Sequence, residues 1–176
     1  MNYNELAKEI HQNAVEHGWW DEERSDGECF ALMHSELSEA LEELRNGHKV
    51  NEIYYHDKKP EGVPIELADV VIRILDWAEH KGLDIERNGE ESKGIYRNSE
   101  KSDALIDGDF INHMHGLLSQ AFMDRNFGGT GEVHLRRVIT MIEEHLAAHG
   151  IHLYDVILIK MAYNKTRPYK HGGKRF

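Results

Sequence analysis

The sequence predicts a single all-α domain built as a bundle of antiparallel helices. Three observations support this fold class. Apolar residues recur at intervals of three and four along most of the chain, and glycine or asparagine ends most of these stretches. No segment alternates apolar and polar residues convincingly, as a half-buried strand would. With 176 residues, the chain is long enough for one buried core and suits one domain spanning 1–176.

Six helices are expected, at about 3–17, 26–46, 64–82, 103–125, 132–149 and 152–165. The second has a clear beginning, because Ser25 and Glu28 have the spacing of a capping box. Pro64 suits the first turn of the third helix. The polar segment 49–62 is expected to be a connection and 86–102 a loop. Pro168 and Gly172-Gly173 are expected to release the tail from the bundle.

The charge of the chain is strongly negative and unevenly distributed. Its 32 acidic and 21 basic residues give a formal net charge of -11, which disfavours duplex nucleic acid as a partner. Residues 160–176, however, contain basic residues and no acidic ones. An acidic body with a basic end suits a site that binds a cation together with a phosphate. The alternative is that the basic tail, 166–176, simply complements the acidic body.

The location expected from the sequence is the cytoplasm. Cys29 is the single cysteine, so no disulfide can form within the chain, as is usual in a reducing compartment. The apolar runs are too short to span a membrane, and the first ten residues lack a signal-peptide core. We therefore expect no membrane partner.

Two pairs of carboxylates are the main candidate site. Glu36 and Glu39 are three residues apart on the second helix, and Glu66 and Asp69 repeat this spacing on the third. Residues three apart share a helix face, and both pairs border an apolar stripe. If the two helices pack antiparallel, the pairs can face each other. Four acids at the edge of a core repel one another unless a cation neutralises them, and Mg²⁺ prefers such oxygen ligands.

The alternative interpretation is a solvated acidic face, in which Arg73 pairs with Glu66 or Asp69 one turn away. That interpretation would suffice for one Glu-x-x-Glu pair. Two pairs on adjacent helices, both at the margin of the core, favour a metal site.

Other residues are candidates for binding a substrate. Lys160, Asn164 and Arg167 are four and three apart, so they share a helix face from which they can reach phosphate oxygens. A solvated basic helix end is the alternative. Trp19 and Trp20 follow the first helix, and we consider Trp20 as a residue that stacks on a base. Tryptophans in such positions more often close the end of a bundle.

The carboxylate motif resembles that of a known family. Ser35-Glu36-Leu-Ser-Glu39, followed by Glu66-Leu-Ala-Asp69, is similar to the Glu-Glu-x-x-Glu and Glu-x-x-Asp signature of MazG-like nucleotide pyrophosphohydrolases, members of the all-α NTP pyrophosphatase superfamily. Ser35 replaces the first glutamate of the signature. The resemblance extends over about 4–83 and 151–173, including the tail from Lys160. It implies an antiparallel bundle in which about 86–149 inserts an extra helix pair before the last helix.

The resemblance also implies an activity. Family members hydrolyse nucleoside triphosphates, often deoxynucleotides, to the monophosphate and pyrophosphate with Mg²⁺, for which Mn²⁺ can substitute. It implies that all four acids are metal ligands and that Glu36 or Glu39 accepts the proton of the attacking water. Family members commonly build their active sites near subunit interfaces. The apolar helix faces also predict a homodimer or homotetramer.

Two other functions compete with this one. Di-iron carboxylate proteins use Glu-x-x-His motifs, and the sequence contains none, which favours a hard cation instead. A non-catalytic helical module that binds nucleotides or a partner stays open as the alternative. The sequence does not determine the preferred base and sugar or the number of metal ions.

Overall fold

The computed structural model of this chain describes residues 2–86 and 107–173, and it is mostly helical. Its helices are α1 (Tyr3–Glu16), α2 (Asp26–Arg45), α3 (Val63–His80), α4 (Asp107–Asn126), α5 (Glu132–Ala148), α6 (Leu153–Asn164) and α7 (Lys170–Gly173). Two short strands, β1 (Tyr54–His56) and β2 (Lys59–Glu61), precede α3. In the described ranges, none of the helices has the length and apolar character needed to cross a membrane.

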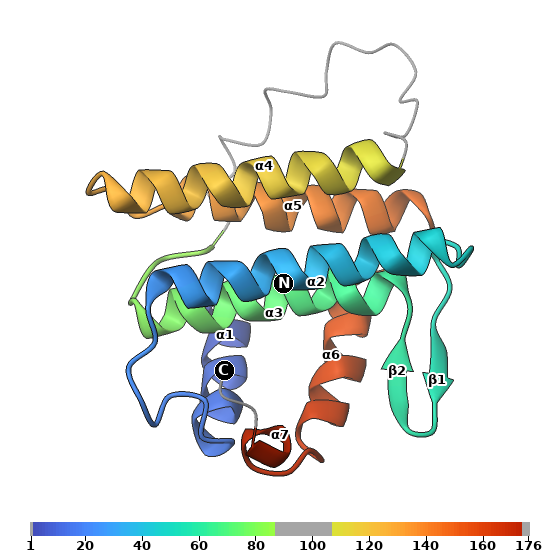
Figure 1. Ribbon diagram of the computed structural model, residues 1–176, viewed down its shortest axis with the longest axis horizontal. Helices are drawn as coiled ribbons and strands as arrows, with labels where there is room; N and C mark the ends of the chain where they lie inside the picture. Colours follow the sequence, from blue (N-terminus) through green and yellow to red (C-terminus); the bar gives the residue numbers. More distant parts are fainter. Residues whose placement is uncertain (1, 87–106, 174–176) are drawn as a thin grey trace.

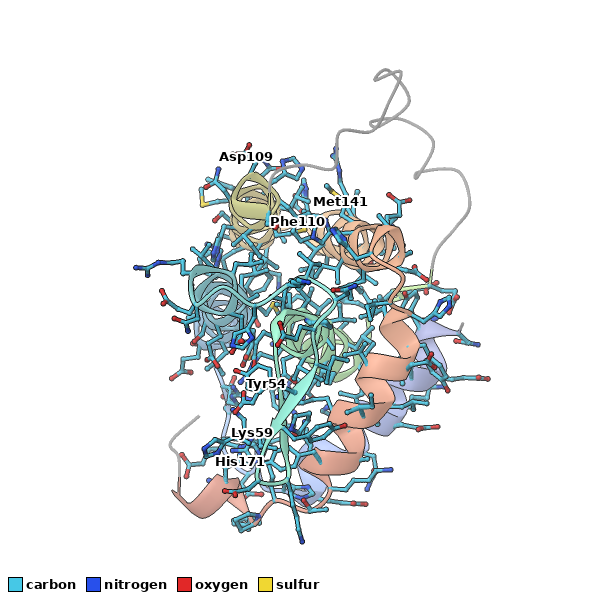
Figure 2. The ribbon with its side chains drawn as sticks, turned by 90° about the vertical axis from the view of Figure 1, so that its right-hand side faces the viewer. Tyr54, Lys59, Asp109, Phe110, Met141 and His171 are labelled. Atoms are coloured by element: carbon cyan, nitrogen blue, oxygen red, sulfur yellow. The ribbon has the colours of Figure 1, made fainter. Side chains whose placement is uncertain are left out.

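The helices form three layers (Figure 1). The pair α4 and α5 lies on one side of the pair α2 and α3, and α1 and α6 cross beneath α3 on the other side. Figure 2 shows that Lys59 and His171 lie on the opposite side of α3 from Phe110 and Met141. The site described below therefore lies on the side of α1, α6 and the strands.

Helix α3 is the centre of the core, since it contacts α1, α2, α5 and α6. Its buried residues surround it on nearly all sides; Ile65, Leu67, Val71 and Ile74 are fully buried. A helix that is apolar around most of its circumference is stable only in the interior. Glu66 and Asp69 are therefore held on a helix that neighbouring helices cover on most sides.

The predicted beginning of α2 is confirmed. Ser25 Oγ accepts a hydrogen bond from the Glu28 backbone N–H at 3.1 Å, and the Ser25 N–H donates to Glu28 Oε2 at 2.9 Å. One residue later, Asp26 accepts from Trp77 Nε1 at 3.0 Å and from Arg125 Nε at 2.9 Å. These bonds join the start of α2 to the end of α3 and to α4, so α2 and α3 run antiparallel and their carboxylate pairs face each other.

The all-α prediction is correct for the three layers but incomplete for the segment 49–62. This segment forms an antiparallel hairpin in which Tyr54 pairs with Glu61 and His56 with Lys59. Asp57 takes the left-handed conformation in the two-residue turn, with φ of 54°, as aspartate tolerates better than most residues. Strands of three residues are too short to show an alternating pattern.

The ends of the predicted helices agree closely with the structure, with two qualifications. The predicted fourth helix began at 103, and 103–106 lie outside the described residues, as does most of the expected loop at 86–102. The tail was predicted to leave the bundle after Pro168. Instead, Lys170–Gly173 form a short turn that packs back on the end of α1, where the Lys170 N–H donates to the His17 carbonyl at 2.9 Å.

Candidate metal and phosphate site

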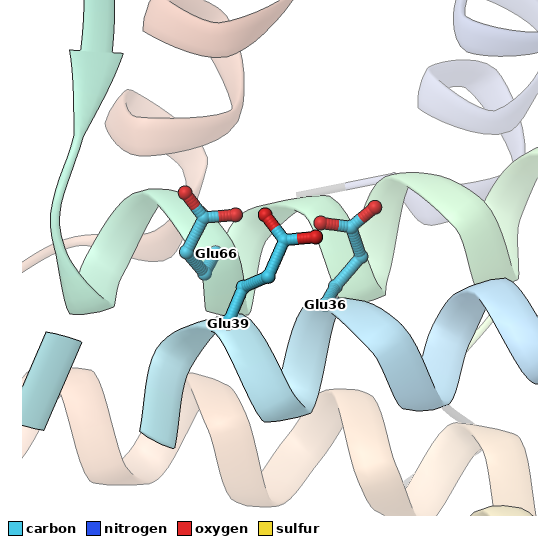
Figure 3. A group of neighbouring side chains, drawn as sticks. All are labelled: Glu36, Glu39 and Glu66. Atoms are coloured by element: carbon cyan, nitrogen blue, oxygen red, sulfur yellow. The ribbon is translucent and has the colours of Figure 1, made fainter. Parts of the chain in front are cut away.

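Three carboxylates from two helices meet at one point. Glu36 and Glu39 extend from α2 and Glu66 from α3, and all three carboxyl groups point to the same side (Figure 3). One oxygen from each lies within 4.8 Å of the others. Two oxygens on opposite sides of one Mg²⁺ are about 4.2 Å apart, because each Mg–O bond is about 2.1 Å. The cluster is therefore close to the size that one hard cation requires.

The carboxylates line a cavity of about 270 Å³. The cavity is bounded by α2 and α3, and it extends between α1 and α6, which both pack on α3. The side chains predicted from the sequence to bind metal or phosphate all line it: Glu36, Glu39, Glu66, Asp69, Lys160, Asn164 and Arg167. The fold thus brings together residues that are up to 131 positions apart in the sequence.

Asp69 differs from the other three acids, because it lies outside the cluster and pairs with a lysine. Its Oδ2 lies 2.5 Å from Lys160 Nζ, and the two side chains are only 13% and 4% exposed. Asp69 is not part of the three-carboxylate cluster, although it lines the same cavity. The fourth acid of the sequence motif therefore holds a cationic side chain beside the cluster.

Arg73 pairs with Glu36, on the neighbouring helix. Both Nε and Nη2 of Arg73 lie 2.6 Å from Glu36 Oε1. The alternative interpretation, in which Arg73 pairs with Glu66 or Asp69 on its own helix, is wrong. The antiparallel packing of α2 and α3 places Glu36 opposite Arg73, and that pair leaves Glu36 Oε2 available for another ligand.

Burial makes the charged form of Glu66 costly. Loss of solvent raises its pKa to about 8, with further contributions from the negative charges of Asp69, Glu36 and Glu39, against the opposing effect of Lys160. Burial likewise raises the pKa of Asp69, although Lys160 opposes this rise. Without a cation in the cluster, burial favours the protonated form of Glu66. A cation that binds there must displace this proton.

Glu39 and Lys59 complete the outer end of the cavity. Glu39 is exposed and makes no hydrogen bond or ion pair within the described part of the chain. Lys59 Nζ lies 2.9 Å from Glu61. Burial opposes the charged form of Lys59, but its bond to Glu61 and the charges of Glu61, Glu66 and Glu39 outweigh burial and raise its pKa. The β-hairpin thus adds a cation next to the carboxylates.

The structure does not bring Trp20 to the cavity. Its indole Nε1 donates to Asp76 Oδ1 at 2.9 Å, and its ring stacks on His80 with the ring centres 3.8 Å apart. Trp20 thus closes one end of the bundle, which was the alternative to base stacking. Trp19 lines the cavity instead, edge-on to His171 with the ring centres 4.7 Å apart.

Several residues that line this cavity were not among the predicted site residues. Arg73 offered one indication, since it lies four residues after Asp69 and hence on the same helix face. Lys59 offered none, because its position depends on a hairpin that the sequence did not predict. The other residues that were not considered come from α1, the α1–α2 connection, α3 and α7: Asn13, His17, Arg24, Asp76 and His171.

Comparison of the chain with family models, with curated proteins and with solved structures finds no match.

Proposed function

We propose that this chain is a Mg²⁺-dependent nucleoside triphosphate pyrophosphohydrolase of the MazG-like kind. Its substrates would be nucleoside triphosphates, deoxynucleotides among them, and its products the monophosphate and pyrophosphate. One observation carries the proposal: the three-carboxylate cluster lines the same cavity as five lysine and arginine side chains. The five basic side chains are Arg24, Lys59, Arg73, Lys160 and Arg167.

The carboxylate cluster suits a hard divalent cation. Glu36, Glu39 and Glu66 offer only oxygen atoms, which Mg²⁺ and Mn²⁺ prefer, and among the described residues no cysteine or histidine belongs to the cluster. Asp69 lies beside them and is available once Lys160 moves toward a phosphate. When bound, the cation would neutralise charge on the triphosphate and acidify an attacking water.

The basic side chains suit the phosphates. Arg73 and Lys160 pair with Glu36 and Asp69, so they are held at the cavity rather than extended into solvent. Arg167 lines the cavity too, with its guanidinium 5.8 Å from the centre of the Tyr163 ring. Arginine can bind two phosphate oxygens at once, and Lys160 contributes a point charge. Cation and anion sites are thus adjacent, as a metal-bound triphosphate requires.

The hydrolytic step needs one proton acceptor. Water adds to one phosphorus atom of the anhydride between the α- and β-phosphates, and the bond from that atom to the bridging oxygen breaks. The other half leaves with that electron pair, as pyrophosphate after attack on the α-phosphorus and as the monophosphate after attack on the β-phosphorus. The proton of the water passes to a carboxylate. Glu39 suits this role best, because it is exposed and has no partner among the described residues that would hold its oxygens.

A nucleotide panel tests the proposal. The protein is incubated with each NTP and dNTP and with Mg²⁺, and pyrophosphate release is measured. Glu39→Gln and Glu66→Gln should each lower kcat at least about 100-fold, because each loses a metal ligand or the proton acceptor. Glu42→Gln is the matched control: Glu42 is exposed on α2, pairs with Arg45 and should have no effect.

The same experiment separates the enzyme from a non-catalytic module. A module would bind nucleotides or a partner without releasing pyrophosphate. The affinity of such a module for nucleotides would also be unchanged in Glu39→Gln and Asp69→Asn. That pair of results would contradict the enzymatic proposal.

A homodimer or homotetramer and a cytoplasmic location stay predictions. The apolar faces of α2 and α3, which suggested a second copy, are covered by α1, α4, α5 and α6 of the same chain. Large apolar side chains that stay exposed include Met123 and Phe127 near the end of α4, and Tyr154 and Leu158 on α6. A second copy would have to pack on such residues, which sedimentation of the purified protein can test.

A further inference from the structure

Asp76 lies at the opposite end of the cavity from the carboxylate cluster. It follows Glu66, Asp69 and Arg73 on α3 at steps of three and four residues, so all four share one helix face. All four line the cavity. At 1.5 Å per residue, Asp76 is about 15 Å along the helix from Glu66. A ligand that fills the cavity from the cluster can therefore reach Asp76 with its far end.

The carboxylate of Asp76 is anchored through one oxygen. His11 Nδ1 lies 2.7 Å from Oδ1, and Trp20 Nε1 donates to the same Oδ1 at 2.9 Å. Within residues 2–86 and 107–173, Oδ2 has no hydrogen-bond partner. The side chain is 15% exposed. The orientation of Asp76 is thus fixed, and one acceptor oxygen is left for a ligand.

The surroundings of Asp76 differ from those of the phosphate end. Asn13, His17, Trp19 and His171 line the cavity between the ends of α1 and α7. Asn13 Oδ1 is buried and has no hydrogen-bond partner in the ranges that the structure describes. Arg24 Nε, a buried donor beside Trp20 that lines the same cavity, also lacks a partner among the described residues, so this end offers a ligand two acceptors and one donor.

We propose that Asp76 is a specificity-determining residue that accepts a hydrogen bond from the exocyclic amino group of the substrate base. This inference rests on the proposed function, since it assigns the nucleoside half of that substrate. The amino groups of cytosine and adenine donate, whereas the carbonyl oxygens at the same positions of uracil and hypoxanthine only accept. A carbonyl there would face the lone pairs of Oδ2 and be rejected.

The test measures binding rather than turnover, so it does not depend on hydrolysis. Calorimetry with Mg²⁺ gives the affinities of the non-hydrolysable α,β-imido analogues of dCTP, dUTP, dATP and dITP. Wild type should bind the amino member of each pair about 10- to 100-fold more tightly, as a hydrogen bond to a charged group implies. In Asp76→Asn the amide can donate to a carbonyl, so the ratio should fall below about threefold or reverse.

Two controls separate specificity from folding. Inorganic tripolyphosphate has no base, so its affinity should be equal in wild type and Asp76→Asn if the variant is folded. Trp20→Phe removes one anchor of Oδ1 but keeps the carboxylate, so it should retain the preference for amino bases. Loss of tripolyphosphate binding in Asp76→Asn together with equal affinities within each base pair in Trp20→Phe would overturn the assignment.

The outcomes distinguish this inference from the proposed function. Equal affinities within each base pair in wild type would overturn the inference, even if pyrophosphate is released. A preference that persists in a protein that releases no pyrophosphate would support it and contradict the enzymatic proposal. A fifth analogue, which lacks the 3′-hydroxyl, tests the sugar. If wild type binds it more weakly than the 3′-hydroxyl form and Asp76→Asn binds the two equally, the donor is a sugar hydroxyl and the base assignment is wrong.

Discussion

Lys160 Nζ lies 2.5 Å from Asp69 Oδ2, and both side chains are almost fully buried. With the Arg73–Glu36 pair, this ion pair neutralises two acids at the site. The basic side chains thus occupy the positions from which they would turn to a substrate phosphate once a cation reaches the carboxylates. The metal and the triphosphate should therefore bind cooperatively, each making the other's ligands available.

Removal of Lys160 should destabilise the metal-free protein. Lys160→Met leaves Asp69 buried without its partner, which should lower the free energy of unfolding by about 2–3 kcal/mol at pH 8. The loss should be smaller at pH 5, where Asp69, whose pKa burial raises, takes up a proton. Urea denaturation in the presence of EDTA measures both values. Lys165→Met, at an exposed position on the next turn, is the control. Equal stabilities of the two variants at pH 8 would show that the ion pair contributes nothing.

The contribution of Glu66 to the stability of the metal-free protein should fall as the pH rises. The pKa of Glu66 is raised from 4.5 to about 8, so the folded state keeps a proton that the unfolded state releases between these values. Each proton so retained lowers the free energy of unfolding by up to about 1.4 kcal/mol per pH unit in that window. Glu66→Gln should remove this contribution to the pH dependence of the free energy of unfolding. The variant should therefore be more stable than wild type at pH 8 in EDTA.

Mg²⁺ provides the complementary measurement. Cation binding displaces the Glu66 proton, so the stabilisation by Mg²⁺ should grow between pH 6 and pH 8 in wild type. It should be absent or weak in Glu66→Gln and unchanged in Glu42→Gln, whose substituted residue is exposed and outside the cluster. If the stabilisation by Mg²⁺ depends on pH in the same way in wild type and in Glu66→Gln, Glu66 does not have the role given to it here.

Arg73 should affect both substrate affinity and the transition state. Arg73→Ala removes a cation that is held 2.6 Å from Glu36 and lines the cavity. We expect kcat/KM to fall by about 100-fold or more, as loss of a charged hydrogen bond to a phosphate implies. Arg73→Lys keeps the charge but loses the fork of donors, so it should recover only part of the activity. Full activity in Arg73→Ala would exclude contact with the substrate.

Gly62 should be essential for positioning the hairpin and the start of α3. Its φ of 114° is one that side-chain-bearing residues rarely adopt, and a Cβ there would collide with the Glu52 carbonyl oxygen. Gly62→Ala should therefore lower the free energy of unfolding by about 2 kcal/mol or more and also lower activity, because Lys59 and Glu66 flank it. Gly116→Ala is a matched change inside α4, where a Cβ meets nothing within 4 Å. It should stabilise the protein by about 0.5–1 kcal/mol.

The fold was predictable wherever local patterns determine it. The Ser25–Glu28 box begins α2 as expected, and helical spacing alone placed Glu36 beside Glu39 and Glu66 near Asp69. The capping box and the helical spacing depend on neighbours in the sequence, so they were predictable. Antiparallel packing of the two helices was only a condition for the pairs to face each other, and the bond from Trp77 on α3 to Asp26 on α2 shows that the structure meets it.

The remaining parts of the site depend on contacts between distant segments. Arg73 has acids on its own helix but pairs with Glu36 on α2. This pairing depends on how α2 packs against α3. Trp19 and Trp20 have the same residue type in the same loop, yet only Trp19 lines the cavity. His171 reaches the cavity because the tail folds back on α1, against the expectation that it leaves the bundle.

The decisive measurement for the proposed pyrophosphohydrolase activity is the identity of the products. The protein is mixed with each NTP and dNTP and with Mg²⁺, and the products are followed by ³¹P NMR, with Glu39→Gln, Glu66→Gln and Glu42→Gln measured in parallel. Wild type and Glu42→Gln should convert a triphosphate to the monophosphate and pyrophosphate, while the two cluster variants should leave it intact. Release of inorganic phosphate with a diphosphate, unchanged turnover in the cluster variants, or no turnover of any nucleotide by wild type would show that the proposed activity is wrong.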